Sequence, residues 1–269
     1  MKKYFLTMGA FAVVVFCQVA QASLMISPTR VVFDERQRTA KVFLINNSQE
    51  AKTYRLGWKE KLALPAGGYR DLNPDQVGPW KLSHLMRVTP RQVHLEAGER
   101  QVVKLALRRK QGMQSGEYRS HLLFQALPTE QQSQSEAIGV SLNMILSYSI
   151  PVIYRKEMLP PDVKISAAKF STGINGKPVI AVDMSREGAA SALGKLQAEW
   201  KPEGAKEWRH IATANNYAIY PEVTKAQVEL NLLAGQVIAG KGQLRVTYTG
   251  QAEYRDHAFS QRIFTIATQ

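Results

Sequence analysis

The sequence predicts an all-β protein made of two sandwich domains. Short apolar runs rich in β-branched residues recur along the chain, for example at 41–46, 102–107 and 243–248, and Gly, Asn, Pro or Ser separates them. No long segment has apolar residues at the three- and four-residue spacing of an amphipathic helix. Many short strands divided by regular turn signals are typical of a β-sandwich.

The first 22 residues have the order of a secretory signal peptide. Lys2 and Lys3 precede an apolar stretch from Phe5 to Phe16, and Ala20-Gln21-Ala22 forms a small-residue cleavage site. An amino-terminal membrane anchor is the alternative, but the apolar stretch is shorter than the roughly 20 residues that span a bilayer. We therefore expect cleavage after residue 22, export from the cytoplasm and no stable membrane insertion.

The exported chain is long enough for two modest domains. Pro160-Pro161 lies in a charged stretch at 155–164, and consecutive prolines cannot belong to a central strand. This predicts a first domain at 23–156 and a second at 157–269. Within the first domain, the polar segment 129–136 has the composition of a loop.

Composition restricts the chemistry available to the exported protein. Its one cysteine, Cys17, lies in the signal peptide, so we expect no disulfide and no cysteine-bound metal. The net charge is +13, and loss of Lys2 and Lys3 with the signal peptide leaves +11, which favours acidic partners. Export and the lack of a recognition motif argue against nucleic acid. The five histidines show no ligand spacing and no hydrolase or nucleotide motif is present, so we assign no catalytic residue, metal or cofactor.

The segment 137–155 has the longest apolar alternation in the chain. Every second position is large and apolar: Ile138, Val140, Leu142, Met144, Leu146, Tyr148, Ile150 and Val152. This exceeds the usual strand of about 5 to 6 residues. One interpretation is an ordinary half-buried strand whose apolar face is all core. The other is a strand that extends past its own core, where it offers a partner main-chain hydrogen bonds and alternate side chains.

Five segments of the first predicted domain occur in a definite order: 27–33, 43–47, 88–99, 116–122 and 150–155. In that order and spacing they resemble the PapD-like periplasmic pilus chaperones. The second domain is similar to that family only in size and strand-rich character. The resemblance implies two immunoglobulin-like β-sandwiches in an L- or boomerang-shaped arrangement, a periplasmic location and a binding protein rather than an enzyme. It also implies a cis peptide bond between Thr89 and Pro90.

The resemblance further implies that 137–155 is a donor strand, which completes the open sandwich of a pilin subunit that lacks its own last strand. The positions that would enter the subunit are Ile138, Val140, Leu142, Met144 and Leu146. The partners implied are pilin or fimbrial subunits and an outer-membrane usher, and the free protein could self-associate through the exposed strand.

Two basic residues hold the terminal carboxylate of the subunit in the family. Arg30 matches the first, and a guanidinium suits a carboxylate because it offers two parallel donors. Pro151 stands where most members have the second, a lysine, and proline has neither charge nor N–H. This departure is similar to the non-classical, or archaic, branch, and we predict Arg119 as the substitute. Glu117 and Arg155 match charged positions of the interdomain cleft that help to orient the domains.

Two other classes of function remain open from the sequence. The chain could be a pilus structural subunit or adhesin, although the donor peptide that such a subunit carries at its start is not evident. It could also be a secreted hydrolase or carbohydrate-binding protein, which would require a polar cluster assembled from distant loops.

Overall fold

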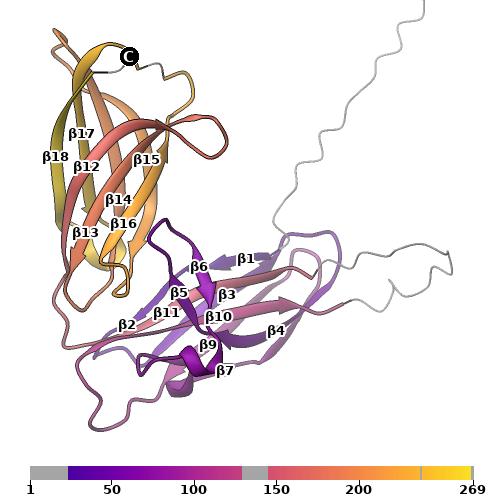
Figure 1. The fold of residues 1–269 in the computed structure, drawn as a ribbon. Helices are drawn as coiled ribbons and strands as arrows, with labels where there is room; N and C mark the ends of the chain where they lie inside the picture. Colours follow the sequence, from indigo (N-terminus) through magenta and orange to yellow (C-terminus); the bar gives the residue numbers. More distant parts are fainter. Residues whose placement is uncertain (1–23, 129–144, 237, 268–269) are drawn as a thin grey trace, which may run out of the picture.

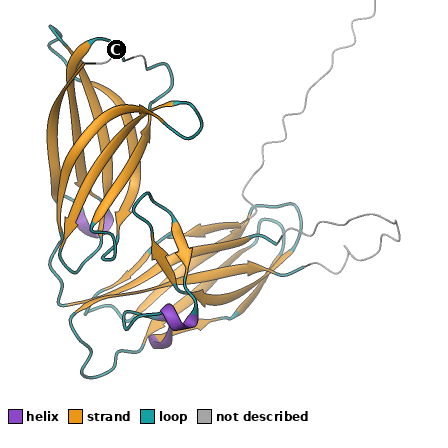
Figure 2. Ribbon diagram, in the orientation of Figure 1, coloured by secondary structure: helices purple, strands orange, loops and turns teal. Residues whose placement is uncertain are grey.

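The computed structural model describes residues 24–128, 145–236 and 238–267. Most of these residues are in strands joined by loops and turns, with a few single turns of 3₁₀-helix (Figure 2). The two groups of strands stand at an angle to each other, so the molecule has the predicted L shape (Figure 1). None of the helices in the described residues is long and apolar enough to cross a membrane.

The first sandwich has an immunoglobulin-type strand order. One sheet runs β1 (Leu24–Ser27), β3 (Thr39–Asn46), β9 (Arg100–Leu107), β7 (Met86–Thr89). The other runs β2 (Val31–Phe33), β11 (Ser147–Lys156), β10 (Gly116–Ala126), β4 (Lys52–Lys59), β8 (Gln92–Leu95). With the short β2 and β8 set aside, seven strands of these two sheets remain, and the sheet of β1, β3, β9 and β7 faces the sheet of β4, β10 and β11, as in an immunoglobulin domain. The Thr89–Pro90 peptide bond is cis, as predicted, and Ser27–Pro28 is cis as well.

The second sandwich follows after a short linker. One sheet contains β12 (Asp162–Thr172), β13 (Pro178–Glu187) and β16 (Lys225–Asn231). The other contains β15 (Arg209–Ile219), β14 (Ala192–Pro202), β17 (Lys241–Gly250) and β18 (Ala258–Ala267). Among the described residues, no ladder pairs a strand up to Lys156 with a strand from Asp162 onward. The all-β fold class predicted from the sequence is therefore confirmed.

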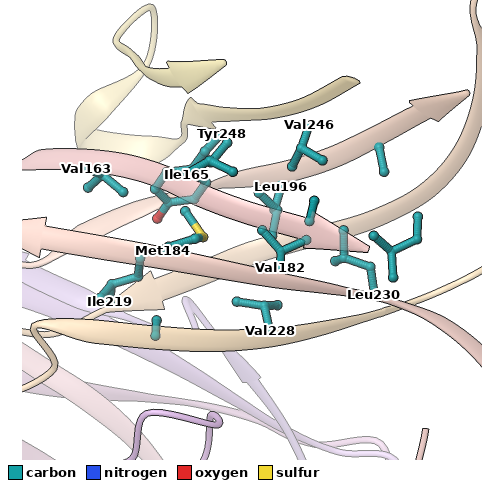
Figure 3. Packing of buried hydrophobic residues seen from close by; sticks show 14 of the residues in the cluster. Val163, Ile165, Val182, Met184, Leu196, Ile219, Val228, Leu230, Val246 and Tyr248 are labelled. Carbon is teal, nitrogen blue, oxygen red and sulfur yellow. The ribbon is translucent and has the colours of Figure 1, made fainter. Parts of the chain in front are cut away.

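Each sandwich encloses its own apolar core. Phe33, Leu44, Tyr54 and Phe124 are fully buried in the first. In the second, Val182 and Val228 of one sheet face Leu196 and Val246 of the other (Figure 3). Burial of each such side chain contributes roughly 1.5 to 3 kcal/mol. Packing of this kind stabilises each sandwich separately.

A small hairpin leaves the first sandwich and reaches the second (Figure 1). It consists of β5 (Lys61–Ala63) and β6 (Tyr69–Asp71), and its turn contains Gly67 and Gly68 at φ of 87° and 76°, a conformation that favours glycine. Gln227 N of β16 donates a hydrogen bond to Pro65 O at 2.8 Å. The chain continues through η1 (Pro74–Gln76) and η2 (Ser83–Leu85) to β7, and η4 (Ala252–Tyr254) precedes β18. The hairpin thus contributes backbone contacts between the domains.

Candidate functional site: an apolar strand start and an interdomain ion-pair cluster

The strand β11 lies between two neighbours that differ in length. Its ladder with β10 runs from Ser147 to Lys156, whereas its parallel ladder with β2 covers Val152 to Tyr154. Among the described residues, the β2 ladder does not reach Ser147, Ser149 or Pro151. Within the part of the chain that the structure describes, no other ladder covers that edge of β11 at these positions.

The burial of apolar side chains changes from β11 to the segment before it. Ile150, Val152 and Tyr154 of β11 belong to the core of the first sandwich. Leu146 and Ile145, which immediately precede β11, are 48% and 49% exposed. The other predicted donor residues, Ile138, Val140, Leu142 and Met144, lie outside the described residues.

The buried carboxylate of Glu117 lies where the two sandwiches meet. Its Oε2 accepts hydrogen bonds from Arg155 Nε at 2.9 Å and from Ser191 N and Oγ at 2.9 and 2.8 Å. Glu117 and Arg155 are on β10 and β11, and Ser191 immediately precedes β14 of the second sandwich. This is where the structure places the two residues for which the resemblance implies a role in domain orientation. The role itself stays a prediction.

Arg155 has further partners in the second sandwich. Its Nη2 donates to Ser191 Oγ at 2.9 Å, Nη1 lies 3.1 Å from Glu253 Oε1, and the guanidinium lies over the Tyr254 ring. Burial by itself would lower the pKa of Arg155, but the negative charges of Glu117 and Glu253 are among the interactions that outweigh it, and the pKa is raised. Arg155 therefore stays charged inside the interface.

Arg30, in the loop between β1 and β2, also reaches the second sandwich. Its Nη2 donates to Ser191 Oγ at 3.0 Å and to Glu253 Oε1 at 3.2 Å, and its Nη1 donates to Tyr220 Oη at 3.1 Å. The Arg30 side chain is 11% exposed. The first predicted anchor is thus held by groups of the second domain and is paired with one of its carboxylates.

Arg119, the second predicted anchor, is on β10 and has a carboxylate partner of its own. Both terminal nitrogens donate to Glu222, with Nη1 at 3.3 Å from Oε2, and Nη2 also donates to Lys61 O at 3.0 Å. Its guanidinium lies 4.0 Å from the centroid of the Tyr220 ring. Burial would lower the pKa of Arg119, but the hydrogen bonds and charge of Glu222 raise it. The structure therefore brings Arg30 and Arg119 together at Tyr220.

A buried histidine lies beside this cluster. His121 is opposite Pro151 in the β10–β11 ladder, and its ring packs edge-on against Tyr69 of the hairpin at 4.7 Å between centroids. Neither ring nitrogen has a hydrogen-bond partner among the described residues. Burial, with a further contribution from the positive charges of Arg119 and Lys61, lowers the pKa of His121 to about 3. The ring is therefore neutral at ordinary pH.

Sequence reasoning missed the second-domain half of the cluster. Ser191, Tyr220, Glu222 and Glu253 are far along the chain from the first-domain residues that they bind: Arg30 and Tyr220 are 190 positions apart, and Arg119 and Glu222 are 103 apart. The buried Arg186 joins the loop that carries Ser191 to the loop that carries Tyr220 and Glu222, because its guanidinium donates to the backbone oxygens of 188, 190 and 221. No motif marks these residues in the sequence.

The chain is similar to solved fimbrial chaperones. The class 5 fimbriae chaperone CfaA is 14% identical with a TM-score of 0.45, and the match covers 91% of this chain and 100% of CfaA. A structure of the Salmonella enterica SafA pilin with the SafB chaperone matches at 12% identity and a TM-score of 0.46, over 92% of this chain and 98% of the other.

A third match is the CsuC–CsuE chaperone–tip adhesion subunit pre-assembly complex of Acinetobacter baumannii. Its identity is 11% and its TM-score 0.43, and it covers 91% of this chain and 98% of the other. No family model and no curated protein matches the chain. Structural similarity at this level assigns neither a family nor a function, so the functional conclusion depends on the residues themselves.

Proposed function

We propose that this protein is a periplasmic chaperone that captures pilin subunits by lending them a strand and delivers them to an outer-membrane usher. The observation that carries the proposal is the segment immediately before β11. Ile145 and Leu146 are exposed apolar residues there, next to strand positions that the β2 ladder does not cover in the described residues. An exposed apolar strand edge is usually avoided because it promotes aggregation. Its presence is explained if a partner strand covers it.

In the sequence, the alternation of large apolar residues continues from β11 back to residue 138. A subunit that lacks its last strand has an apolar groove, and each donor side chain that enters it contributes roughly 1.5 to 3 kcal/mol. Several such side chains together are comparable to the whole stability of a domain, about 5 to 15 kcal/mol. A strand of this kind could hold a subunit that does not fold alone, without nucleotide, metal or catalysis.

The cluster between the domains supports the proposed carboxylate anchor. Arg30 and Arg119 are held in place by second-domain groups and converge on Tyr220. A positioned guanidinium binds a carboxylate through two charge-assisted hydrogen bonds, which are roughly twice as strong as neutral ones. Anchoring at one end of the strand would set the register in which the subunit pairs with it.

Co-purification from the periplasm tests the proposal. Wild-type protein is expected to retain a pilin subunit, and Leu146→Glu is expected to lose it because a charge would enter the apolar groove. Ile263→Glu is the matched control, since Ile263 on β18 of the second sandwich is 49% exposed and Leu146 is 48% exposed. Both variants should keep the wild-type circular dichroism spectrum.

Capture of the pilin by Leu146→Glu at the wild-type level would contradict the donor-strand role. Polymerisation of the purified wild-type protein would instead favour a pilus structural subunit or adhesin. Recovery of glycans without a pilin would favour the carbohydrate-binding alternative.

A further inference from the structure

The sheet of β1, β3, β9 and β7 has an outer face whose charged residues are all positive. Side chains of these strands alternate between the core and the outside, so every second residue belongs to this cationic face. Its charged members are Lys41, Arg87, Arg100 and Lys104, and among its positions, all of which the structure describes, none is a carboxylate. The face therefore attracts negatively charged partners.

Two of the cations are directly opposite each other. Lys41 and Lys104 pair in the β3–β9 ladder, and both are exposed. Like charges in this arrangement destabilise a sheet. The ion pairs within the described residues include none of Lys41, Arg87 and Lys104. A bound partner with negative charges would remove this repulsion.

The cationic face also presents apolar side chains. Met25 is opposite Ile45 in the β1–β3 ladder and is 46% exposed. Phe43 is opposite Val102 in the β3–β9 ladder, and both are half-buried. The Arg100 guanidinium lies over the Phe43 ring, 4.2 Å from its centroid. Apolar groups between cations are typical of a surface that attaches to an anionic membrane.

The cationic face lies on the side of the first sandwich away from the second. Val32 and Ile153, on the outer face of the other sheet, pack with the second sandwich. The two sheets are opposite layers of one sandwich, so the outer face of β1, β3, β9 and β7 points the other way. A surface as large as a membrane can therefore reach this face without meeting the second domain.

An acidic protein is the alternative partner for such a face. Two of the four cations, Lys41 and Lys104, are lysines, and an ammonium lacks the fork geometry with which arginine selects a single carboxylate. A phospholipid surface requires only a density of positive charge and some apolar contact. Those are the two properties that the face combines, so the chemistry favours lipid.

We propose that the cationic face binds the anionic phospholipid surface of a membrane. Lys41, Arg87 and Lys104 contact the headgroups, and Met25 enters the boundary with the acyl chains. The inference goes beyond the proposed function and does not rest on it. Each Lys or Arg near such a surface strengthens binding about fivefold. Salt weakens the attraction because it screens the charges.

Vesicle sedimentation tests the proposal on the chain from Ser23 onward. The probes are vesicles of phosphatidylcholine alone and vesicles of phosphatidylcholine mixed with phosphatidylglycerol. At about 0.15 M salt, the wild-type protein is expected to bind the mixed vesicles more tightly than the neutral ones by about tenfold or more. Binding to the mixed vesicles should be lost at about 1 M salt.

Paired substitutions test whether this face is the one that binds. Lys41→Gln combined with Lys104→Gln should weaken binding to the mixed vesicles by about 25-fold. Lys169→Gln combined with Lys225→Gln is the matched control, because these lysines are exposed on β12 and β16 of the second sandwich and the net charge changes equally. The control should bind as the wild type does. The first double variant should unfold in urea at least as late as the wild type, because its like-charge pair is gone.

A fluorescent label tests whether the apolar part of the face meets the membrane. Cys17 is the one cysteine in the sequence and precedes Ser23, so Met25→Cys provides a single labelling site. A nitrobenzoxadiazole label there should brighten when mixed vesicles are added, because the dye enters apolar surroundings. The same label at Ile263→Cys should not, although Ile263 on β18 is 49% exposed and therefore matches Met25.

Equal binding of the two kinds of vesicle, equal losses in the two double variants, or a label at Met25→Cys that does not brighten would each overturn the proposal. Binding of the wild type to polyglutamate but not to mixed vesicles would overturn it as well and would assign the face to an acidic protein. These measurements use no pilin. Pilin capture without vesicle binding would therefore leave the proposed function standing, and vesicle binding without pilin capture would leave the membrane face standing.

Discussion

Protonation of His121 is expected to weaken the fold in mild acid. The ring is 1% exposed, neither nitrogen is hydrogen-bonded within the described residues, and Arg119 and Lys61 are close enough to repel an added charge. The pKa of His121 is therefore lowered from 6.5 to about 3 in the folded protein. In the unfolded chain the same histidine titrates near its ordinary value, so the unfolded state binds the proton first as the pH falls.

The size of the effect follows from this difference in pKa. The contribution of the neutral His121 ring to the free energy of unfolding has its full value above about pH 6.5. It decreases as the pH falls toward 3. Each pH unit in that window corresponds to about 1.4 kcal/mol, so the free energy of unfolding should fall by about 2 kcal/mol between pH 7 and pH 5. Asp34 and Asp71 affect stability mainly below this range, because hydrogen bonds lower their pKa values.

The assay compares urea unfolding of the wild type and His121→Phe at the two pH values. Phenylalanine keeps the edge-on ring contact with Tyr69 and carries no titratable group, so it should remove the 2 kcal/mol difference. His121→Phe should also be at least as stable as the wild type at pH 7, since an unpaired buried polar ring becomes apolar. An equal loss of stability in both proteins, or a His121 proton resonance that titrates between pH 6 and 7, would refute the reasoning.

Further substitutions test the cluster and the strand. Arg30→Ala should weaken the binding of pilin, measured by calorimetry, by roughly 1.5 to 3 kcal/mol. Arg30→Lys should restore only part of this binding free energy, because an ammonium lacks the fork geometry of a guanidinium. Unchanged affinity of both variants would exclude Arg30 as a carboxylate anchor. Arg155→Ala should lower the free energy of unfolding by about 3 to 5 kcal/mol by leaving the buried Glu117 charge without its positive partner, whereas Arg245→Ala at a partly exposed pair should cost about 0 to 1 kcal/mol. Equal decreases in the free energy of urea unfolding for Arg155→Ala and Arg245→Ala would contradict the stabilising role of the buried pair. Leu142→Glu should abolish pilin capture with an unchanged circular dichroism spectrum, and unfolding of the variant would assign this face to the core.

Local patterns in the sequence determined the fold class. The strands of both sandwiches appear as short apolar runs because a half-buried strand needs a side-chain period of two, which is visible in any window of a few residues. Pro160-Pro161 indicates the break between β11 and β12 for a similarly local reason, since proline lacks the N–H that a central strand requires. The cis bond at Thr89–Pro90 followed from the resemblance and is confirmed.

The second-domain half of the interdomain cluster could be found from the tertiary structure alone. Sequence analysis named Arg30, Arg119, Glu117 and Arg155 but none of the groups that bind them from the second domain. Arg30 and Glu253 are 223 positions apart, and Arg119 and Glu222 are 103 apart. A hydrogen bond depends on distance in space and leaves no periodicity in the chain, so only the packing of the two sandwiches and the hairpin at 61–71 could show which carboxylates the predicted anchors hold.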